Sequence, residues 1–70
     1  MKAYKIEVEK WAGVNRYKSV ESAYSNFKHD AVIKLFELER EYRQYSGFCG
    51  RVIVKNTTTG RVINSVEVHS

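Results

Sequence analysis

Ser19–Tyr45 reads SVESAYSNFKHDAVIKLFELEREYRQY and carries the strongest periodic signal in the chain. Apolar side chains recur there every three or four residues, at Val20, Tyr24, Phe27, Ala31, Leu35, Leu38, Tyr42 and Tyr45. This spacing predicts one long amphipathic helix from about 19 to about 45, with Ser19 as its N-cap. Asp30 could instead cap a second helix, so a break near His29–Asp30 is the alternative.

The glycines that follow predict where this helix stops. Gly47 suits the left-handed residue that commonly ends a helix, and Phe48 can then fold back on Tyr42. Gly50 leads into the next apolar run. The stretch around the single cysteine, QYSGFCGRV, is therefore expected to be the junction between helix and strand.

The N-terminal residues alternate in character with a period of two, which predicts a strand. Tyr4, Ile6 and Val8 share one face, and the other face carries Lys5, Glu7, Glu9 and Trp11. A turn at Ala12–Gly13 would return the chain as an antiparallel hairpin. Pairing Trp11 with Val14 places opposite charges together, Glu9 with Arg16 and Glu7 with Lys18.

A second hairpin is predicted after the helix, because RVIVK and RVINSVEV flank the turn sequence NTTTG. Pairing Lys55 with Arg61 sets Val54 against Val62 and Ile53 against Ile63. The same register sets Cys49 against Glu67.

These elements predict one small α+β domain over residues 1–70, in the order strand, strand, helix, strand, strand. An antiparallel-rich sheet would pack on the one long amphipathic helix. A chain of this size buries only about 60% of its unfolded surface, so we expect marginal stability.

Composition excludes several classes of function. One cysteine permits no internal disulfide, and no Cys or His spacing typical of a zinc site occurs, so we expect no metal and no cofactor. No apolar run approaches a membrane span, and the N-terminus lacks the apolar core of a signal peptide. We expect a cytoplasmic protein with no membrane association and no small-molecule substrate.

Catalysis is not expected either. A nucleophilic cysteine needs a base, and His29 lies far along the predicted helix. His69 is expected to fray, and Glu67 opposite Cys49 would disfavour a thiolate. We therefore expect no catalytic residues, and Cys49→Ser should leave stability and binding nearly unchanged.

The sheet face away from the helix is the best candidate for binding. Its candidate contact residues are Trp11, Val14, Arg16, Lys18, Arg51, Ile53, Lys55, Arg61 and Ile63. Trp, Arg and Ile suit a protein interface. Basic side chains around one aromatic also suit a nucleic-acid backbone with a stacked base, and 12 Lys and Arg against 8 Asp and Glu permit it.

The long helix also predicts a homodimer. At about 40 Å it would overhang strands of about 23 Å. A second copy would then cover the overhanging Leu38, Tyr42 and Tyr45.

Three stretches, YKIEVEKW, YKSVESA and VIVKNTTTGRVI, together resemble small phage-encoded proteins of unknown role. Those proteins share an opening strand that ends near a Trp, a Ser-led helix and a closing hairpin. The resemblance implies an accessory protein that binds and inhibits a host or defence protein, and it implies no particular site residues.

Overall fold

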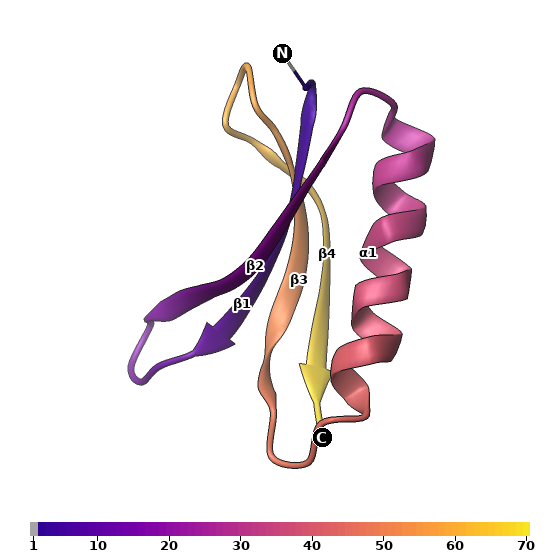
Figure 1. Ribbon diagram of the computed structural model, residues 1–70. Helices are drawn as coiled ribbons and strands as arrows, with labels where there is room; N and C mark the ends of the chain where they lie inside the picture. Colours follow the sequence, from indigo (N-terminus) through magenta and orange to yellow (C-terminus); the bar gives the residue numbers. More distant parts are fainter. Residues whose placement is uncertain (1) are drawn as a thin grey trace.

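A computed structural model describes residues 2–70 as four strands and one helix. In chain order these are β1 (Tyr4–Trp11), β2 (Tyr17–Ser25), α1 (Lys28–Arg43), β3 (Cys49–Asn56) and β4 (Val62–His69) (Figure 1). The strands form one antiparallel sheet in the order β2-β1-β3-β4, and α1 packs across one face. The predicted α+β architecture is confirmed.

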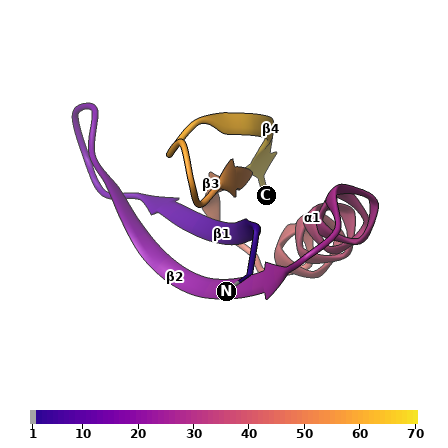
Figure 2. The same cartoon turned by 90° about the horizontal axis from the view of Figure 1, so that it is seen from above.

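The sheet is curved and its two hairpins bend away from the helix. Figure 2 shows α1 on one side of the strands, whereas the loop between β1 and β2 reaches to the opposite side. Figure 1 shows that this loop, the end of β4 and the end of α1 all lie at the same end of the molecule.

The core lies between α1 and the sheet. Its central side chains are fully buried, and its members are Ile6, Val8, Ala31, Leu35, Leu38, Tyr42, Phe48, Val52, Val54 and Val68. Alternation along β1 and β3 supplies the sheet half of this layer, since every second side chain points toward the helix. Alanine and leucine at helical spacing supply the other half.

The predicted helix boundary is wrong. Residues 17–25 form β2, not the first turns of a helix, and α1 is 16 residues long. Ser19 is therefore a strand residue. The alternative break at His29–Asp30 falls in the first turn of α1. Val20, Tyr24 and Phe27, which completed the predicted stripe, are 47%, 54% and 67% exposed.

The shorter helix removes the reason given for a homodimer. Sixteen residues span about 24 Å, and eight-residue strands span about 27 Å, so nothing overhangs. Leu38 and Tyr42 are 1% and 8% exposed within a single chain, and only Tyr45 is half exposed. The homodimer itself stays a prediction.

The end of α1 differs from the predicted glycine stop. The C-cap is Gln44, and Gly47, with φ of 81°, lies in the following turn. The Phe48 N–H closes that turn on the Tyr45 carbonyl at 3.3 Å. Phe48 does fold back on Tyr42, with ring centroids 5.0 Å apart.

The predicted register of the first hairpin is wrong. Trp11 faces Tyr17 instead of Val14, and Glu9 faces Ser19 instead of Arg16. The turn is longer than two residues, because the Ala12 N–H donates to the Arg16 carbonyl at 2.9 Å. An irregularity after Val8 shifts the pairing once more along the strand.

The second hairpin is offset by two residues from its prediction. Asn56 Oδ1 accepts the backbone N–H groups of Thr58 and Thr59 in the turn, and Lys55 pairs with Val62, one residue beyond Arg61. A register shift between Val54 and Lys55 adds the second residue. Ile53 consequently faces Ser65, not Ile63, and Cys49 faces His69, not Glu67. Because side chains alternate with period two, the two-residue shift keeps residues 49–54 and their partners on their predicted faces, whereas the register shift between Val54 and Lys55 moves Val62 to the face away from α1.

No helix within residues 2–70 combines the length and the apolar character needed to cross a membrane.

Candidate functional site

The face of the sheet away from α1, called here the open face, follows from the register. Three rows of its side chains run across β2, β1, β3 and β4, in order Ser19-Glu9-Arg51-Glu67, Ser22-Glu7-Ile53-Ser65 and Tyr24-Lys5-Lys55-Val62. Beyond Lys10–Gly50, where the pairing of β1 with β3 ends, Trp11 pairs with Tyr17 and Cys49 pairs with His69. The curvature of the sheet makes the middle of this face well covered. Ile53 is only 2% exposed and Glu7 only 8%.

Glu7 is the buried charge of the open face, and it is fully partnered. Its carboxylate accepts the Ser19 hydroxyl at 2.9 Å and lies 3.3 Å from the Lys5 ammonium. Burial acts to raise the pKa of Glu7, but the Ser19 hydrogen bond and Lys5, with a smaller effect from Lys55, outweigh it. The pKa of Glu7 therefore lies below its ordinary value, and the carboxylate is charged at neutral pH.

Arg51 also has partners within the open face, a carboxylate and an aromatic ring. Its Nε lies 2.7 Å from Glu9 Oε1, and its guanidinium carbon lies 4.0 Å from the centroid of the Tyr17 ring. Stacking on an aromatic ring and pairing with a carboxylate are the two contacts that a guanidinium favours. Together they hold the Tyr17 ring against Arg51, beside the Ser19-Glu9-Arg51-Glu67 row.

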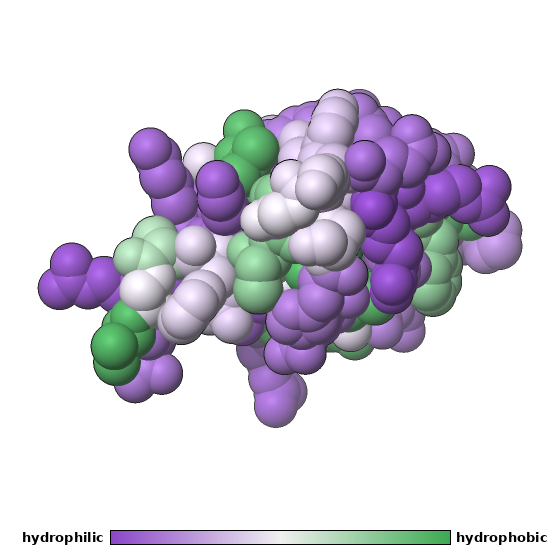
Figure 3. All heavy atoms as spheres, turned by 90° about the horizontal axis from the view of Figure 1, so that it is seen from below, coloured by the Kyte–Doolittle hydropathy of each residue, from purple (hydrophilic) through white to green (hydrophobic). Residues whose placement is uncertain are grey.

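A cleft of about 260 Å³ opens at the end of the face where the β1–β2 hairpin bends away from β3 and β4. Its lining residues are Trp11, Tyr17, Cys49, Gly50, Glu67 and His69. Trp11 and Tyr17 are 52% and 41% exposed. Figure 3 views this end of the molecule and shows a near-white and green band between purple hydrophilic groups.

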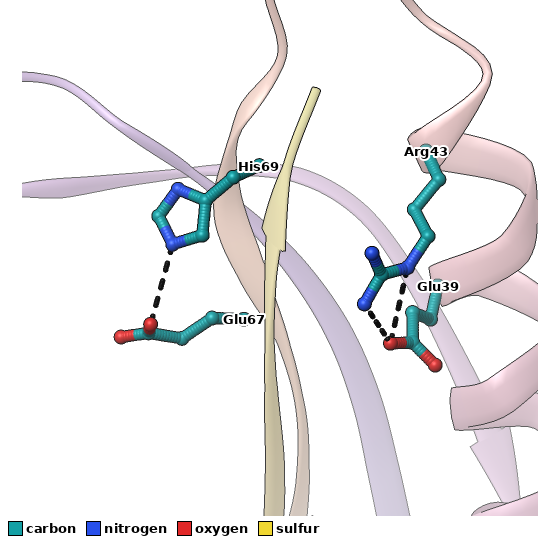
Figure 4. A network of polar contacts seen from close by, with 4 residues as sticks. All are labelled: Glu39, Arg43, Glu67 and His69. Carbon is teal, nitrogen blue, oxygen red and sulfur yellow. Dashed lines mark hydrogen bonds and ion pairs between the residues drawn. The ribbon is translucent and has the colours of Figure 1, made fainter.

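Three side chains on one wall of the cleft form a hydrogen-bonded chain. Cys49 Sγ lies 3.3 Å from His69 Nδ1, and His69 Nε2 lies 3.3 Å from Glu67 Oε2. Figure 4 shows the imidazole and the carboxylate extending from the same side of β4, apart from the Glu39–Arg43 ion pair on α1. The end of β4 is held in place because the Ser70 N–H donates to the Phe48 carbonyl at 2.9 Å.

Gly50 allows the two hairpins to meet beside the cleft. A Cβ at this position would lie 2.1 Å from the carbonyl oxygen of Glu9. Only glycine therefore permits the close approach of β3 to β1 at the Lys10–Gly50 pair.

The structure brings together only some of the residues predicted for binding. Trp11, Arg51, Ile53 and Lys55 lie on the open face, although Ile53 is too buried to be a contact. The rest are placed elsewhere: Val14 and Arg16 in the first turn, Lys18 on the helix side of β2, Arg61 in the second turn and Ile63 at the irregularity of β4.

Sequence reasoning missed Tyr17 and the contact of Cys49 with His69. Both depend on registers set by turn lengths. Recognising that Asn15, which adopts a φ of 53°, extends the first turn would have placed Tyr17 opposite Trp11.

Within residues 2–70, no group of three or more His, Cys, Asp or Glu side chains could hold a metal ion. Comparisons of the chain with protein-family models, curated proteins and solved structures found no match.

Proposed function

We propose that this protein acts by binding another protein on the open face, and that the cleft receives an apolar or aromatic side chain of the partner. The observation that carries the proposal is the cleft lined by Trp11 and Tyr17, two half-exposed aromatic residues on neighbouring strands. Tryptophan, tyrosine and arginine are the residues that most often dominate binding energy at interfaces.

The size of the cleft supports an anchor side chain in preference to a free small molecule. Its volume is about 260 Å³, whereas sites that enclose small ligands usually measure about 300–1,000 Å³. A protruding side chain needs less room because its backbone stays outside.

The charges of the open face favour a protein over a nucleic acid. Lys5, Arg51 and Lys55 are balanced by the same number of carboxylates, on Glu7, Glu9 and Glu67. Two of the three cations already lie in ion pairs. A phosphate backbone requires cations that are free to replace its counterions, so the predicted nucleic-acid alternative has weaker support.

The opening strand that ends at Trp11 and the closing hairpin resemble small phage-encoded proteins, although YKSVESA forms a strand and not the Ser-led helix of that layout. This partial resemblance favours a bacterial host or defence protein as the partner. Binding would then inhibit or modulate that protein, without a reaction performed by this chain.

Affinity capture from a bacterial lysate tests the proposal. We expect the wild type and Phe36→Ala to retain the same partner, and Trp11→Ala to lose it. Phe36 is the matched control because it is as exposed as Trp11 and lies on α1, which covers the opposite face of the sheet. Nuclease treatment should change nothing.

Oligonucleotide binding provides the opposing outcome. Micromolar binding that weakens steeply with salt, together with loss of the captured material on nuclease treatment, would replace the proposal with the nucleic-acid alternative.

A further inference from the structure

The Cys49–His69–Glu67 chain uses groups that the proposed binding function does not need. It contains the single thiol of the protein, a base within hydrogen-bond distance and a carboxylate beyond the base. The thiol is partly exposed and lines the cleft.

The carboxylate determines which nitrogen of the imidazole is free. Glu67 can only accept a hydrogen bond, so His69 Nε2 carries the proton in that contact. In the neutral ring, Nδ1 then has the lone pair, and it faces Cys49 Sγ at 3.3 Å. This is the arrangement of nucleophile, base and orienting group that activates thiols elsewhere.

We propose that Cys49 is a site of covalent modification by thiol–disulfide exchange with small disulfides, with His69 as the base and Glu67 as its positioning residue. The thiol proton passes to His69 Nδ1, and the thiolate attacks one sulfur of the reagent RS–SR. A Cys49–S–S–R bond forms as the reagent S–S bond breaks. The leaving RS⁻ takes the electron pair and then the proton from the imidazolium, so Cys49 is oxidised and one RSH is released.

The cleft determines which disulfides react well. The R group attached to Cys49 would lie against Trp11 and Tyr17, so aromatic disulfides should be favoured. The other charged or titratable groups around the thiol are Tyr17 on β2, Glu9 on β1, Arg51 on β3 and Glu67 on β4. Glu9 and Arg51 neutralise each other at 2.7 Å, which leaves His69 as the group positioned to take the proton.

An adduct would fill the cleft and so release a partner that uses it. This consequence depends on the proposed binding function, whereas the reactivity of the thiol does not. The two are therefore tested separately.

The first experiment measures the rate of reaction with 4,4′-dithiodipyridine from the released thiopyridone, with Cys49→Ser as the blank. An ordinary cysteine is only a few per cent thiolate at about pH 7. We expect His69→Ala to react about tenfold more slowly than the wild type at neutral pH and within about twofold of it near pH 10, where solvent hydroxide can take the proton in place of the imidazole. His29→Ala, which alters the exposed histidine of α1, should leave the rate unchanged.

Two further variants separate the roles. Glu67→Ala should slow the reaction at about pH 7 by about threefold, because the imidazole is no longer held in one tautomer. Trp11→Ala should reduce the preference for the aromatic disulfide over glutathione disulfide. His69→Gln keeps the polarity of the exposed side chain and replaces His69→Ala if that variant unfolds. Equal rates for the wild type and the His69 variant at neutral pH would overturn the proposal.

Discussion

The hydroxyl of Tyr42 joins the end of α1 to the edge strand β2, and removing it should weaken the fold measurably. Tyr42 Oη donates to Glu21 Oε1 at 2.6 Å, while its ring packs on Phe48 and Tyr45. Tyr42→Phe deletes the hydrogen bond to Glu21 and preserves the packing of the ring on Phe48 and Tyr45. A hydrogen bond to a charged group contributes about 1.5–3 kcal/mol. Because Glu21 is exposed, we expect a loss of about 1.5 kcal/mol.

That loss is large for a domain of this size. One kcal/mol shifts the Tm of a domain of 60–100 residues by about 4–8 °C, so Tyr42→Phe should melt about 6–12 °C below the wild type. Thermal unfolding followed by far-ultraviolet circular dichroism measures this shift. Tyr45→Phe is the matched control because Tyr45 is 51% exposed and its side chain contacts Tyr42 through the ring, which the substitution keeps.

A double-mutant cycle with Glu21→Gln isolates the contact itself. We expect a coupling free energy of about 1 kcal/mol between the two positions. A Tm within about 1 °C of the wild type, or a coupling near zero, would refute the reasoning. Because the contact lies within one chain, the effect should not vary with protein concentration, whereas a contact between copies would make the Tm depend on it.

The remaining predictions concern the sheet and its titrating groups. Gly50→Ala should cost about 3 kcal/mol in urea unfolding, because its Cβ would meet the backbone of Glu9, and a cost below about 1 kcal/mol would contradict that close approach. The lowered pKa of Glu7 means that its contribution to stability is present above pH 4.5 and is lost as the pH falls through the lowered value. Glu7→Gln should therefore lie furthest below the wild type near neutral pH and approach it in acid, as measured by urea midpoints against pH. The hydrogen bond to Glu21, followed by burial, raises the pKa of Tyr42, so its contribution is full below about pH 10 and falls above it. Tyr42→Phe should lack that part of the alkaline decline, and parallel pH curves would count against the assignment.

The sequence predicted the order of the elements but misassigned β2, for a physical reason. Val20, Tyr24 and Phe27 precede α1 at the same three- or four-residue spacing as its buried residues. In the sequence, the apolar helical pattern therefore begins well before the helix does. In the sheet, the irregularity opposite Val8–Glu9 changes the phase of β2 and hides the alternation that marks a strand. Residues 17–25 form a strand because they pair with β1, and the sequence of the segment alone does not indicate that pairing.

The two hairpin registers failed in the same way and with different consequences. The first turn is longer than predicted, and the second hairpin combines a turn one residue longer with a register shift between Val54 and Lys55. In the second hairpin, the shift of two residues kept Arg51, Ile53, Ser65 and Glu67 on the predicted face, but the register shift between Val54 and Lys55 brought Val62 to the open face. The shift of two residues also changed the neighbour of Cys49 from Glu67 to His69. Alternation along a strand predicts which face of the sheet a side chain lies on. Which side chains come within hydrogen-bond distance, such as Cys49 and His69, depends on the register.

The strand order β2-β1-β3-β4 has a consequence for how the chain folds. Each hairpin is local and can form within microseconds, but β1 and β3 meet across a long separation, such as the 42 residues from Glu9 to Arg51. Closing the loop between β1 and β3 is the entropically costly step. Formation of α1 shortens the flexible part of this loop, because 16 of its residues become helical. Substitutions at the β1–β3 seam should therefore slow folding, whereas those at the hairpin tips should mainly accelerate unfolding. The β1–β3 pairing that supports the cleft is thus also the contact that first joins the N-terminal and C-terminal hairpins during folding.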